Sequence, residues 1–239
     1  MKFYPINLNL KDKNVLIVGA GKVALRKFKR LLPTGARIKI VAPEFNQGFS
    51  SYSNQESEEY ILLERKFIEE DLIGQFLVFA ATDNSSLNER IALLARGKNI
   101  LINIIDNAEL SDFTVPAVVN RGELLLTVSS GSNLPALSKN IRKKLESDFG
   151  LEYRLLLDIM SEKRQEIIEN IEDDKLRKTI FSEIASDVFM SKIKDIIADH
   201  NPEILANSNY QFDSTEYLAV KKDIKAAVSQ LIEKMKSQK

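Results

Sequence analysis

The chain has 239 residues, and its 34 lysines and arginines balance its 34 aspartates and glutamates. A zero net charge excludes a global field that would attract nucleic acid or a membrane surface, so an anionic partner must be held by local basic residues. The absence of cysteine excludes disulfides, thiolate zinc sites, iron–sulfur clusters and a cysteine nucleophile.

The N-terminal residues 1–10 carry no apolar run of signal-peptide length, and no stretch approaches the ~20 apolar residues of a membrane span. We therefore expect a soluble, cytoplasmic protein without a membrane partner. No extended basic face with interleaved aromatic residues is present, so we expect no nucleic-acid partner either.

The first part of the chain alternates apolar and amphipathic segments. Strands are expected at Val15–Val18, Ala36–Ala42, Tyr60–Leu63, Phe76–Ala81 and Ile100–Ile105. A helix is expected at Val23–Leu32, with a basic outer face made of Arg26, Lys27, Lys29 and Arg30. A second helix is expected at Ser86–Arg96, with Ser85 or Ser86 as its cap. This alternation predicts a parallel sheet with right-handed crossovers.

The pattern changes after Asp106. Two strands are expected at Phe113–Val119 and Leu124–Val128, followed by a helix at Leu134–Glu146. From residue 151 onward the chain reads as helical, with core-facing stripes such as Leu176, Ile180, Ile184 and Val188, or Tyr217, Val220, Ile224, Val228, Leu231 and Met235.

The predicted fold class is α/β. We expect a Rossmann-type parallel-sheet domain over residues 1–112, a small α+β dimerisation segment over 113–150, and a helical C-terminal domain over 151–239.

A glycine-rich segment, Gly19-Ala20-Gly21-Lys22-Val23-Ala24, follows the first strand and begins the first helix, in the G-x-G-x-x-G/A pattern. Gly19 permits a tight turn and Gly21 lets the backbone approach a pyrophosphate. The helix N-terminus, which includes Lys22 and Val23, offers free N–H groups to phosphates. The pattern predicts a dinucleotide site; the alternative is a glycine turn that only packs the sheet.

Two neighbouring positions extend this site. Pro43 and Glu44 follow the second strand, where an acidic group accepts hydrogen bonds from the adenosine ribose and repels a 2′-phosphate. No arginine follows immediately, so Glu44 favours NAD over NADP. Thr82 and Asp83 end the fourth strand at the carboxyl edge, where ligands bind in open sheets, although a helix-capping turn explains them equally simply.

The candidate reactive group is Asp106, which directly follows Asn103-Ile104-Ile105 at the end of the fifth strand. A partly desolvated carboxylate there can act as a general base, and the alternative is a turn or cap aspartate. A second signal is the loop Ser129-Ser130-Gly131-Ser132-Asn133, whose following helix carries Lys139, Arg142, Lys143 and Lys144. Hydroxyls, a helix N-terminus and basic side chains suit carboxylate groups, and they also fit a solvated lysine-rich face.

Taken together, these segments resemble the precorrin-2 dehydrogenase family, which forms the N-terminal module of siroheme synthases. The resemblance covers roughly residues 2–150 and rests on the segments 15–27, 80–83, 103–106, 113–117 and 127–131 with the helix that follows. The glycine pattern alone is unspecific. The combination of Asp106 with Phe113-Thr114-Val115-Pro116 and the serine loop is specific. The family's loop usually continues Gly-Thr-Ser-Pro, where this chain has Ser132-Asn133-Leu134-Pro135.

The resemblance implies a homodimeric oxidoreductase that uses NAD+ to oxidise precorrin-2 to sirohydrochlorin in siroheme, hence porphyrin-type, biosynthesis. It implies that Asp106 is the key site residue and that Ser129, Ser130 and Asn133 lie at the tetrapyrrole pocket. Some members also insert Fe2+ and so act as ferrochelatases, which are lyases. The methyltransferase domain of longer siroheme synthases has no counterpart in residues 151–239.

Two other functions stay open at this point: a non-catalytic NAD-sensing module, and an NAD-dependent dehydrogenase of another substrate. Iron insertion also stays open. His200, the single histidine, is expected at a solvated helix end, and we predict no protein metal site.

Overall fold

The computed structural model describes residues 3–53, 57–105, 107–131, 134–206 and 214–238. Two of the residues singled out above, Asp106 and Asn133, lie outside this described part. The chain forms two compact units, residues 1–115 and residues 116–239, which are called here the first and the second unit.

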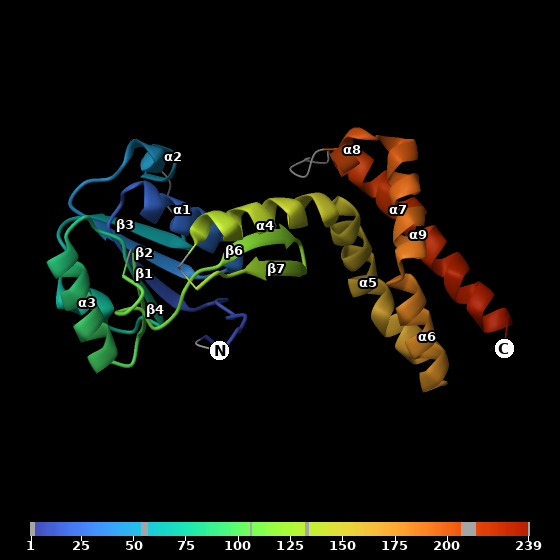
Figure 1. Cartoon of the computed structure of the whole chain (residues 1–239), viewed down its shortest axis with the longest axis horizontal. Coiled ribbons are helices and arrows are strands. Elements are labelled where there is room, and N and C mark those ends of the chain that lie inside the picture. The colour runs from blue at the N-terminus through green and yellow to red at the C-terminus, as the bar shows by residue number, and fades with distance from the viewer. Residues whose placement is uncertain (1–2, 54–56, 106, 132–133, 207–213, 239) are drawn as a thin grey trace. The chain divides into compact units, whose positions relative to one another are not determined.

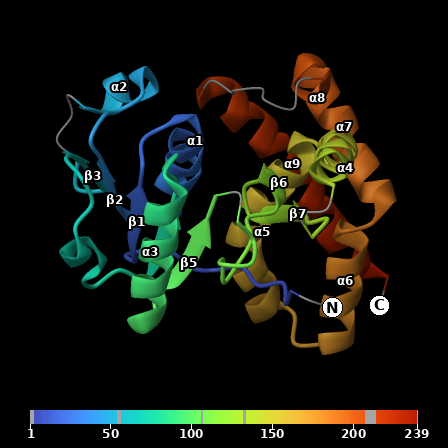
Figure 2. The same ribbon diagram turned by 60° about the vertical axis from the view of Figure 1, so that its left-hand side comes forward.

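The first unit is built on a five-stranded parallel sheet with the order β3-β2-β1-β4-β5. Strands β1 to β4 are labelled in Figure 1 and β5 in Figure 2. Its strands are β1 (Asn14–Val18), β2 (Arg37–Ala42), β3 (Tyr60–Glu64), β4 (Leu77–Ala80) and β5 (Leu101–Ile104). The chain builds outward from β1 to β3 and then returns to place β4 on the other side of β1. In open α/β sheets, ligands bind at the carboxyl ends of the strands where the order reverses in this way. The predicted Rossmann-type class is confirmed.

Helices α1 (Lys22–Leu31) and α3 (Ser85–Gly97) cover opposite faces of this sheet, and the short α2 (Ser50–Ser53) lies beyond β2 (Figure 1). Under α1 the fully buried ring of Phe28 contacts Phe49, Tyr52 and Tyr60, with centroids 4.9–5.6 Å apart. Under α3 the core contains Ile91, Ala92 and Ala95 packed on alternate residues of the same strands. Because both faces are covered, the strands are apolar runs rather than alternating patterns.

One part of the predicted outer face of α1 is wrong. Lys27 is partly buried, while Arg26, Lys29 and Arg30 are exposed. The reason is helical spacing: Ala24, Lys27, Phe28 and Leu31 stand at i, i+3, i+4 and i+7, which is the spacing of one helix face. Lys27 therefore lies on the face that packs against the sheet.

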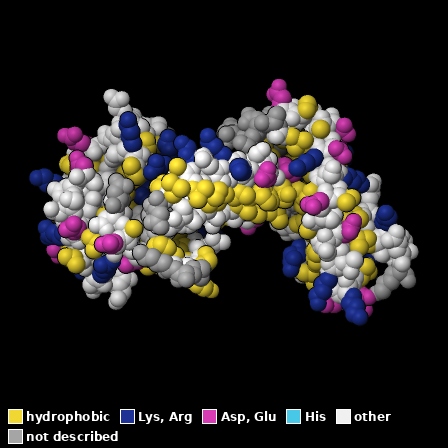
Figure 3. Space-filling view, viewed as in Figure 1, with side chains coloured by type: hydrophobic (Ala, Val, Ile, Leu, Met, Phe, Trp, Pro, Cys, Tyr) yellow, Lys and Arg dark blue, Asp and Glu magenta, His cyan; other side chains and the backbone are white. Residues whose placement is uncertain are grey.

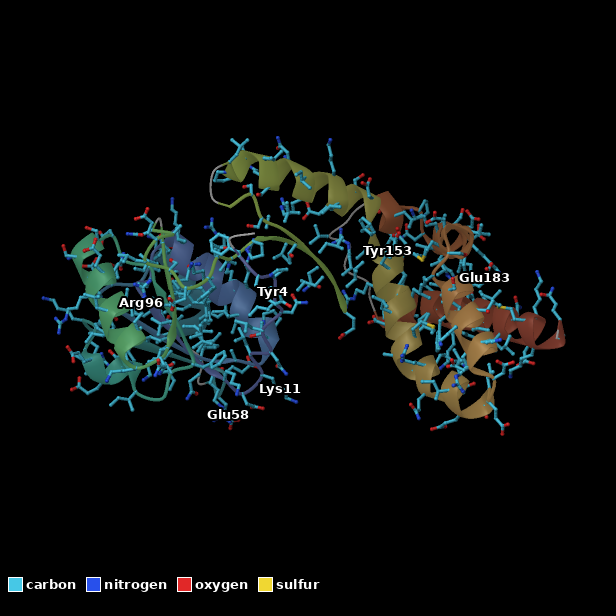
Figure 4. All side chains as sticks on the ribbon, turned by 60° about the horizontal axis from the view of Figure 1, so that its bottom comes forward. Tyr4, Lys11, Glu58, Arg96, Tyr153 and Glu183 are labelled. Atoms are coloured by element: carbon cyan, nitrogen blue, oxygen red, sulfur yellow. The ribbon has the colours of Figure 1, made fainter. Side chains whose placement is uncertain are left out.

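After β5 the chain turns and residues 110–113 run back beside that strand. The Asp112 N–H donates to the Ile102 carbonyl at 2.9 Å, and the Asp112 carboxylate accepts from the Ile102 N–H at 3.0 Å. The Ser111 hydroxyl oxygen accepts from the Ile104 N–H at 2.9 Å. Arg96 of α3, labelled in Figure 4, pairs with Asp112 at 3.4 Å. Side-chain bonding of this kind replaces the start of the strand expected from Phe113, and the next strand begins only at Ala117.

The second unit begins with an antiparallel hairpin of β6 (Ala117–Arg121) and β7 (Leu124–Val128), which turns through Gly122 at φ 69°. Helix α4 (Pro135–Asp148) packs on this hairpin. Arg121, only 6% exposed, donates from Nε to the Phe149 carbonyl at 2.8 Å and from Nη2 to the Glu146 carbonyl at 3.1 Å. These bonds satisfy carbonyls at the end of α4 that the helix itself leaves without donors.

The remaining helices share one apolar core, and Figure 2 shows α5, α6, α7 and α9 packed together. They are α5 (Leu151–Asn170), α6 (Asp174–Ile184), α7 (Asp187–His200), α8 (Glu203–Ala206) and α9 (Ser214–Ser237). The predicted stripe from Leu176 fails at Val188, which is 77% exposed because α6 ends at Ile184 and a new helix begins at Asp187. No helix in the described ranges is long and apolar enough to cross a bilayer.

Candidate active site

The glycine turn joins the ends of three strands. Gly19 has φ +107°, its N–H donates to the Val41 carbonyl at 2.8 Å, and the Ala81 N–H donates to the Val18 carbonyl at 2.7 Å. A Cβ at Gly19 would lie 2.3 Å from the Ala81 carbonyl oxygen. Both the left-handed backbone and the close approach therefore require glycine at this position.

Gly21 faces open space. A Cβ there would meet no atom within 4 Å. Gly21 also caps α1 without a side-chain hydrogen bond, and the first turn contains no acidic residue. Lys22 is exposed and Val23 is partly buried in that turn. The start of α1 thus offers free N–H groups and partial positive charge to an anion that approaches the backbone closely, as a pyrophosphate does.

The loop after β2 lies against this turn. Pro43 and Glu44 are exposed at the end of β2, and the Asn46 N–H donates to the Ala20 carbonyl at 3.0 Å. The Asn46 side chain in turn accepts from the Gly48 N–H at 3.0 Å. The Glu44 carboxylate therefore belongs to a loop that is tied to the glycine turn.

Thr82 and Asp83 follow β4 at the same edge. The Thr82 hydroxyl donates to Asn88 Oδ1 at 2.7 Å, and Asn88 Nδ2 donates to the Thr82 carbonyl at 3.0 Å. Asn84 is the cap of α3, since its side chain accepts from the Leu87 N–H at 2.9 Å; the predicted caps Ser85 and Ser86 are wrong. Thr82 is thus held by a local network, while Asp83 is exposed at the carboxyl edge.

The backbone on either side of position 106 is anchored at this edge. The Ile105 N–H donates to the Ala80 carbonyl at 3.1 Å, and Ile104 forms an isolated antiparallel bridge with Asn107. The Asn107 side chain accepts from the Leu110 N–H at 3.1 Å. The neighbours of Asp106 therefore stand at the carboxyl ends of β4 and β5, and β4 pairs directly with β1, the strand that ends at the glycine turn.

The sequence did not predict a contact that Lys27 makes on the α1 face of the sheet. Lys27 Nζ donates to Asn103 Oδ1 at 3.0 Å and lies 4.3 Å from the centroid of the Phe79 ring. Asn103 is 8% exposed and its Nδ2 donates to the Phe113 carbonyl at 2.9 Å. The signal for it was present, because Lys27 occupies a core-facing position of an amphipathic helix.

The serine loop belongs to the second unit. The Ser130 hydroxyl donates to the Leu134 carbonyl at 3.0 Å and accepts from the Ser138 hydroxyl at 2.8 Å. Ser129 is exposed, with its hydroxyl oxygen 3.4 Å from the Gly131 nitrogen that donates to it. These bonds brace the loop against the first turns of α4. On α4 itself Arg142 pairs with Glu146, and Lys139, Lys143 and Lys144 are exposed.

Among the described residues, no group of three histidine, aspartate or glutamate side chains is arranged to hold a metal ion. His200 Nε2 lies 2.8 Å from Asp223 Oδ2, which joins the end of α7 to α9. This contact is part of the helical core's surface rather than of the strand edge.

Comparisons with known proteins agree with this geometry. Residues 6–117 match a family model described as putative NAD(P)-binding. The siroheme synthase of Vesicomyosocius okutanii is 34% identical over 204 residues, which are 83% of this chain and 43% of that protein. The siroheme synthase of Psychromonas ingrahamii is 34% identical over 184 residues, which are 77% of this chain and 39% of that protein.

The chain thus spans about two fifths of the length of these curated relatives. Among solved structures, SirC, a precorrin-2 dehydrogenase, matches with a TM-score of 0.67 at 23% identity, covering 94% of this chain and 100% of that one. This likeness confirms the predicted fold class, an α/β parallel-sheet domain followed by a largely helical part.

Proposed function

We propose that this chain, which belongs to the family of the N-terminal module of siroheme synthases, oxidises precorrin-2 to sirohydrochlorin with NAD+. The observation that carries the proposal is the glycine turn, where Gly19 is wedged against the carbonyl of Ala81 and Gly21 faces open space. That turn lies at the carboxyl end of β1, where the strand order of the sheet reverses, and β4 lies between β1 and β5, the strand that leads to Asp106.

The residues at the turn fit a nicotinamide dinucleotide. The N–H groups at the start of α1 and Lys22 would hold the pyrophosphate, with Val23, Pro43, Thr82 and Asp83 around the nucleotide. When bound, the cofactor supplies a hydride acceptor. The chain supplies binding and orientation through groups that are already fixed by strand-end hydrogen bonds.

We assign the preference for NAD over NADP to Glu44. Its carboxylate is exposed in the loop tied to the glycine turn, where it would accept hydrogen bonds from the ribose and repel a 2′-phosphate. We expect NAD+ to bind at least about tenfold more tightly than NADP+, a difference of ~1.4 kcal/mol. Glu44→Gln should narrow this ratio, and Glu59→Gln, in the loop before β3, is the matched control. Equal affinities for the two cofactors in the wild type would contradict the assignment.

For the reaction itself we assign proton removal to the carboxylate of Asp106. Oxidation of precorrin-2 transfers one hydride to NAD+ and releases one proton, giving sirohydrochlorin, NADH and H+. A carboxylate that follows β5 can accept that proton at an Oδ atom, since β5 ends at the same edge of the sheet as β1 and its glycine turn. Ser129, Ser130 and Asn133 are assigned to the substrate's carboxylates, as hydroxyl and amide donors.

We also propose that the active form is a homodimer that pairs through α4. Leu134, Leu137 and Ile141 lie at i, i+3 and i+7 and are 53%, 46% and 37% exposed. Figure 3 shows hydrophobic side chains gathered along this helix. An apolar stripe of this length on a helix that already packs on a hairpin is typical of a subunit interface. The segment 113–150 would then be the dimerisation segment and 151–239 a helical domain.

The deciding experiment incubates the pure chain with enzymatically produced precorrin-2 and NAD+ and follows NADH and the sirohydrochlorin spectrum. We expect stoichiometric formation of both, and Asp106→Asn should lower kcat at least about 100-fold, which is typical of general acid–base groups. Cofactor binding without turnover would indicate an NAD-sensing module, and turnover of another carbonyl or alcohol substrate would indicate a different dehydrogenase. Insertion of Fe2+ into the product stays a prediction, tested by adding the ion once oxidation is complete.

A further inference from the structure

A cleft on the first unit lies beside α1, on the sheet face that carries Phe79. It is lined by Arg26, Lys27, Arg30, Leu31, Phe79 and Val115. Three of these side chains are cationic and three are apolar. The cleft is separate from the glycine turn, because Lys27 stands five residues after Lys22, which is ~7.5 Å further along the helix.

Two cations of this cleft, Arg26 and Lys27, have no aspartate or glutamate within ion-pairing distance in the described part of the chain. Lys27 instead rests on neutral groups, with Asn103 Oδ1 at 3.0 Å and the Phe79 centroid at 4.3 Å. Burial and the charges of Arg26 and Arg30 lower the pKa of Lys27 to about 8. A bound anion would relieve this repulsion, which is the electrostatic condition for an anion site.

We propose that this cleft is a subsite for a carboxylate-bearing side chain of the tetrapyrrole, with Lys27 and Arg26 as the groups that bind it. The inference rests on the proposed function. Arginine and lysine bind carboxylates through charge-assisted hydrogen bonds. The apolar groups Leu31, Phe79 and Val115 suit the hydrocarbon part of such a side chain better than they suit a bare phosphate.

The position of the cleft gives the subsite a role in orientation. Asn103, the acceptor for Lys27, lies on β5 three residues before Asp106. A substrate anchored beside Asn103 is therefore held near the strand whose end carries the proposed proton acceptor. Lys27 and Arg26 are specificity-determining residues in this scheme, since they select substrates by charge and do not take part in hydride or proton transfer.

The test uses the full chain and purified sirohydrochlorin as the probe, with binding followed by absorbance. Lys27→Met keeps the length of the side chain and removes its charge, and Arg26→Ala removes an exposed cation. We expect each to raise the Kd for sirohydrochlorin about 10-fold or more, as for the loss of a charge-assisted pair. The KM for precorrin-2 should rise with little change in kcat. Lys27→Arg should recover most of the affinity.

Lys29→Met is the matched control, because Lys29 is exposed on the same helix and does not line the cleft. The Kd for NADH, measured by its fluorescence, should be unchanged in all variants, and circular dichroism should confirm folding. Wild-type affinity for sirohydrochlorin in both Lys27→Met and Arg26→Ala would overturn the subsite while leaving the dehydrogenase intact. A rise in the Kd for NADH instead would assign the cleft to the nucleotide. A wild-type chain that neither binds sirohydrochlorin nor oxidises precorrin-2 would overturn the proposed function, and the subsite with it.

Discussion

The two units differ in how one inward-facing charge is partnered. In the second unit, the two buried charged side chains that the structure describes are satisfied within the unit: Arg121 donates to main-chain carbonyls, and Glu152 lies 3.3 Å from Lys194 Nζ. In the first unit, Asp71 is likewise paired with Arg65, but the partly buried Lys27 lines a cleft and, among the described residues, contacts an amide oxygen and a ring rather than a carboxylate.

This difference distinguishes charges that stabilise the fold from a charge that is available to a ligand. A buried charge that is fully paired fixes helix ends and loops, and breaking it costs stability without changing recognition. A cation left without a carboxylate costs stability in the free protein, and such costs concentrate where ligands bind. In the proposed function, the first unit therefore carries the cofactor site and the proton acceptor, and the second carries the serine loop, the supporting helices and, through α4, the proposed assembly.

The largest effect is expected at the glycine turn. Gly19→Ala should raise the Kd for NADH at least about 100-fold, since the new Cβ would meet the Ala81 carbonyl and alanine disfavours φ +107° by ~1–3 kcal/mol. Fluorescence titration measures it. Gly97→Ala, in α3, is the control: no atom lies within 4 Å of its new Cβ, so affinity should be unchanged. Normal NADH binding by Gly19→Ala would remove the basis of the nucleotide site.

The next effect concerns assembly by the second unit. Leu137→Glu puts a charge in the apolar face of α4 and should convert the proposed dimer into a monomer of 27.1 kDa. Light scattering after size exclusion measures the mass. Leu218→Glu, at a 63% exposed position of α9, should leave the dimer intact. If Leu137→Glu stays dimeric, the subunits pair through another surface.

A smaller effect tests the scaffold side of the comparison. Arg121→Met leaves the Glu146 and Phe149 carbonyls without their donors, and should lower the free energy of unfolding by about 2 kcal/mol. The Kd for NADH should not change, because the glycine turn belongs to the other unit. Arg154→Met, at a half-exposed ion pair, should cost less than about 1 kcal/mol. A cofactor-binding defect in Arg121→Met would show that the units are not separable in this way.

The smallest effect is a gain. The pKa of Lys27 is about 8 in the folded chain and 10.5 as a free side chain, so the unfolded state binds more protons between these values. Wild-type stability should therefore rise with pH from about 8 to 10.5, and Lys27→Met should be more stable than wild type below pH 8 by about 1 kcal/mol. Arg26 and Arg30 of α1 are the charges at this site; Asn103 and Phe79 of the sheet are neutral. Denaturant unfolding at pH 7 and 10 measures the difference in the free energy of unfolding between Lys27→Met and the wild type. A larger advantage of the variant at pH 10 than at pH 7 would contradict this prediction.

Much of the first unit could be predicted from sequence because doubly covered strands leave continuous apolar runs, and β1, β2 and β4 each lie within a residue of their expected bounds. The glycine pattern predicted a turn that the structure places at the strand edge. The sequence could not predict hydrogen bonds between side chains and the main chain of a separate segment. Ser111 and Asp112 take over the hydrogen bonds beside β5, so the strand expected from Phe113 does not begin there.

The burial of two residues was also predicted incorrectly, because it depends on their position around the helix axis and not on residue type alone. Lys27 looks like part of a basic surface when residue types are counted, yet its phase relative to Ala24, Phe28 and Leu31 turns it inward. Val188 was predicted to be buried because it continues the four-residue period of α6, but it lies beyond the end of that helix and is exposed. In both cases the period was right, and the residue type or the helix boundary was misjudged.

The return of residues 110–113 beside β5 has a consequence for colloidal behaviour. A terminal strand normally exposes unpaired N–H and C=O groups that can recruit strands from other molecules. Here Ser111 and Asp112 occupy those of Ile102 and Ile104, so this border of the sheet offers no template for aggregation.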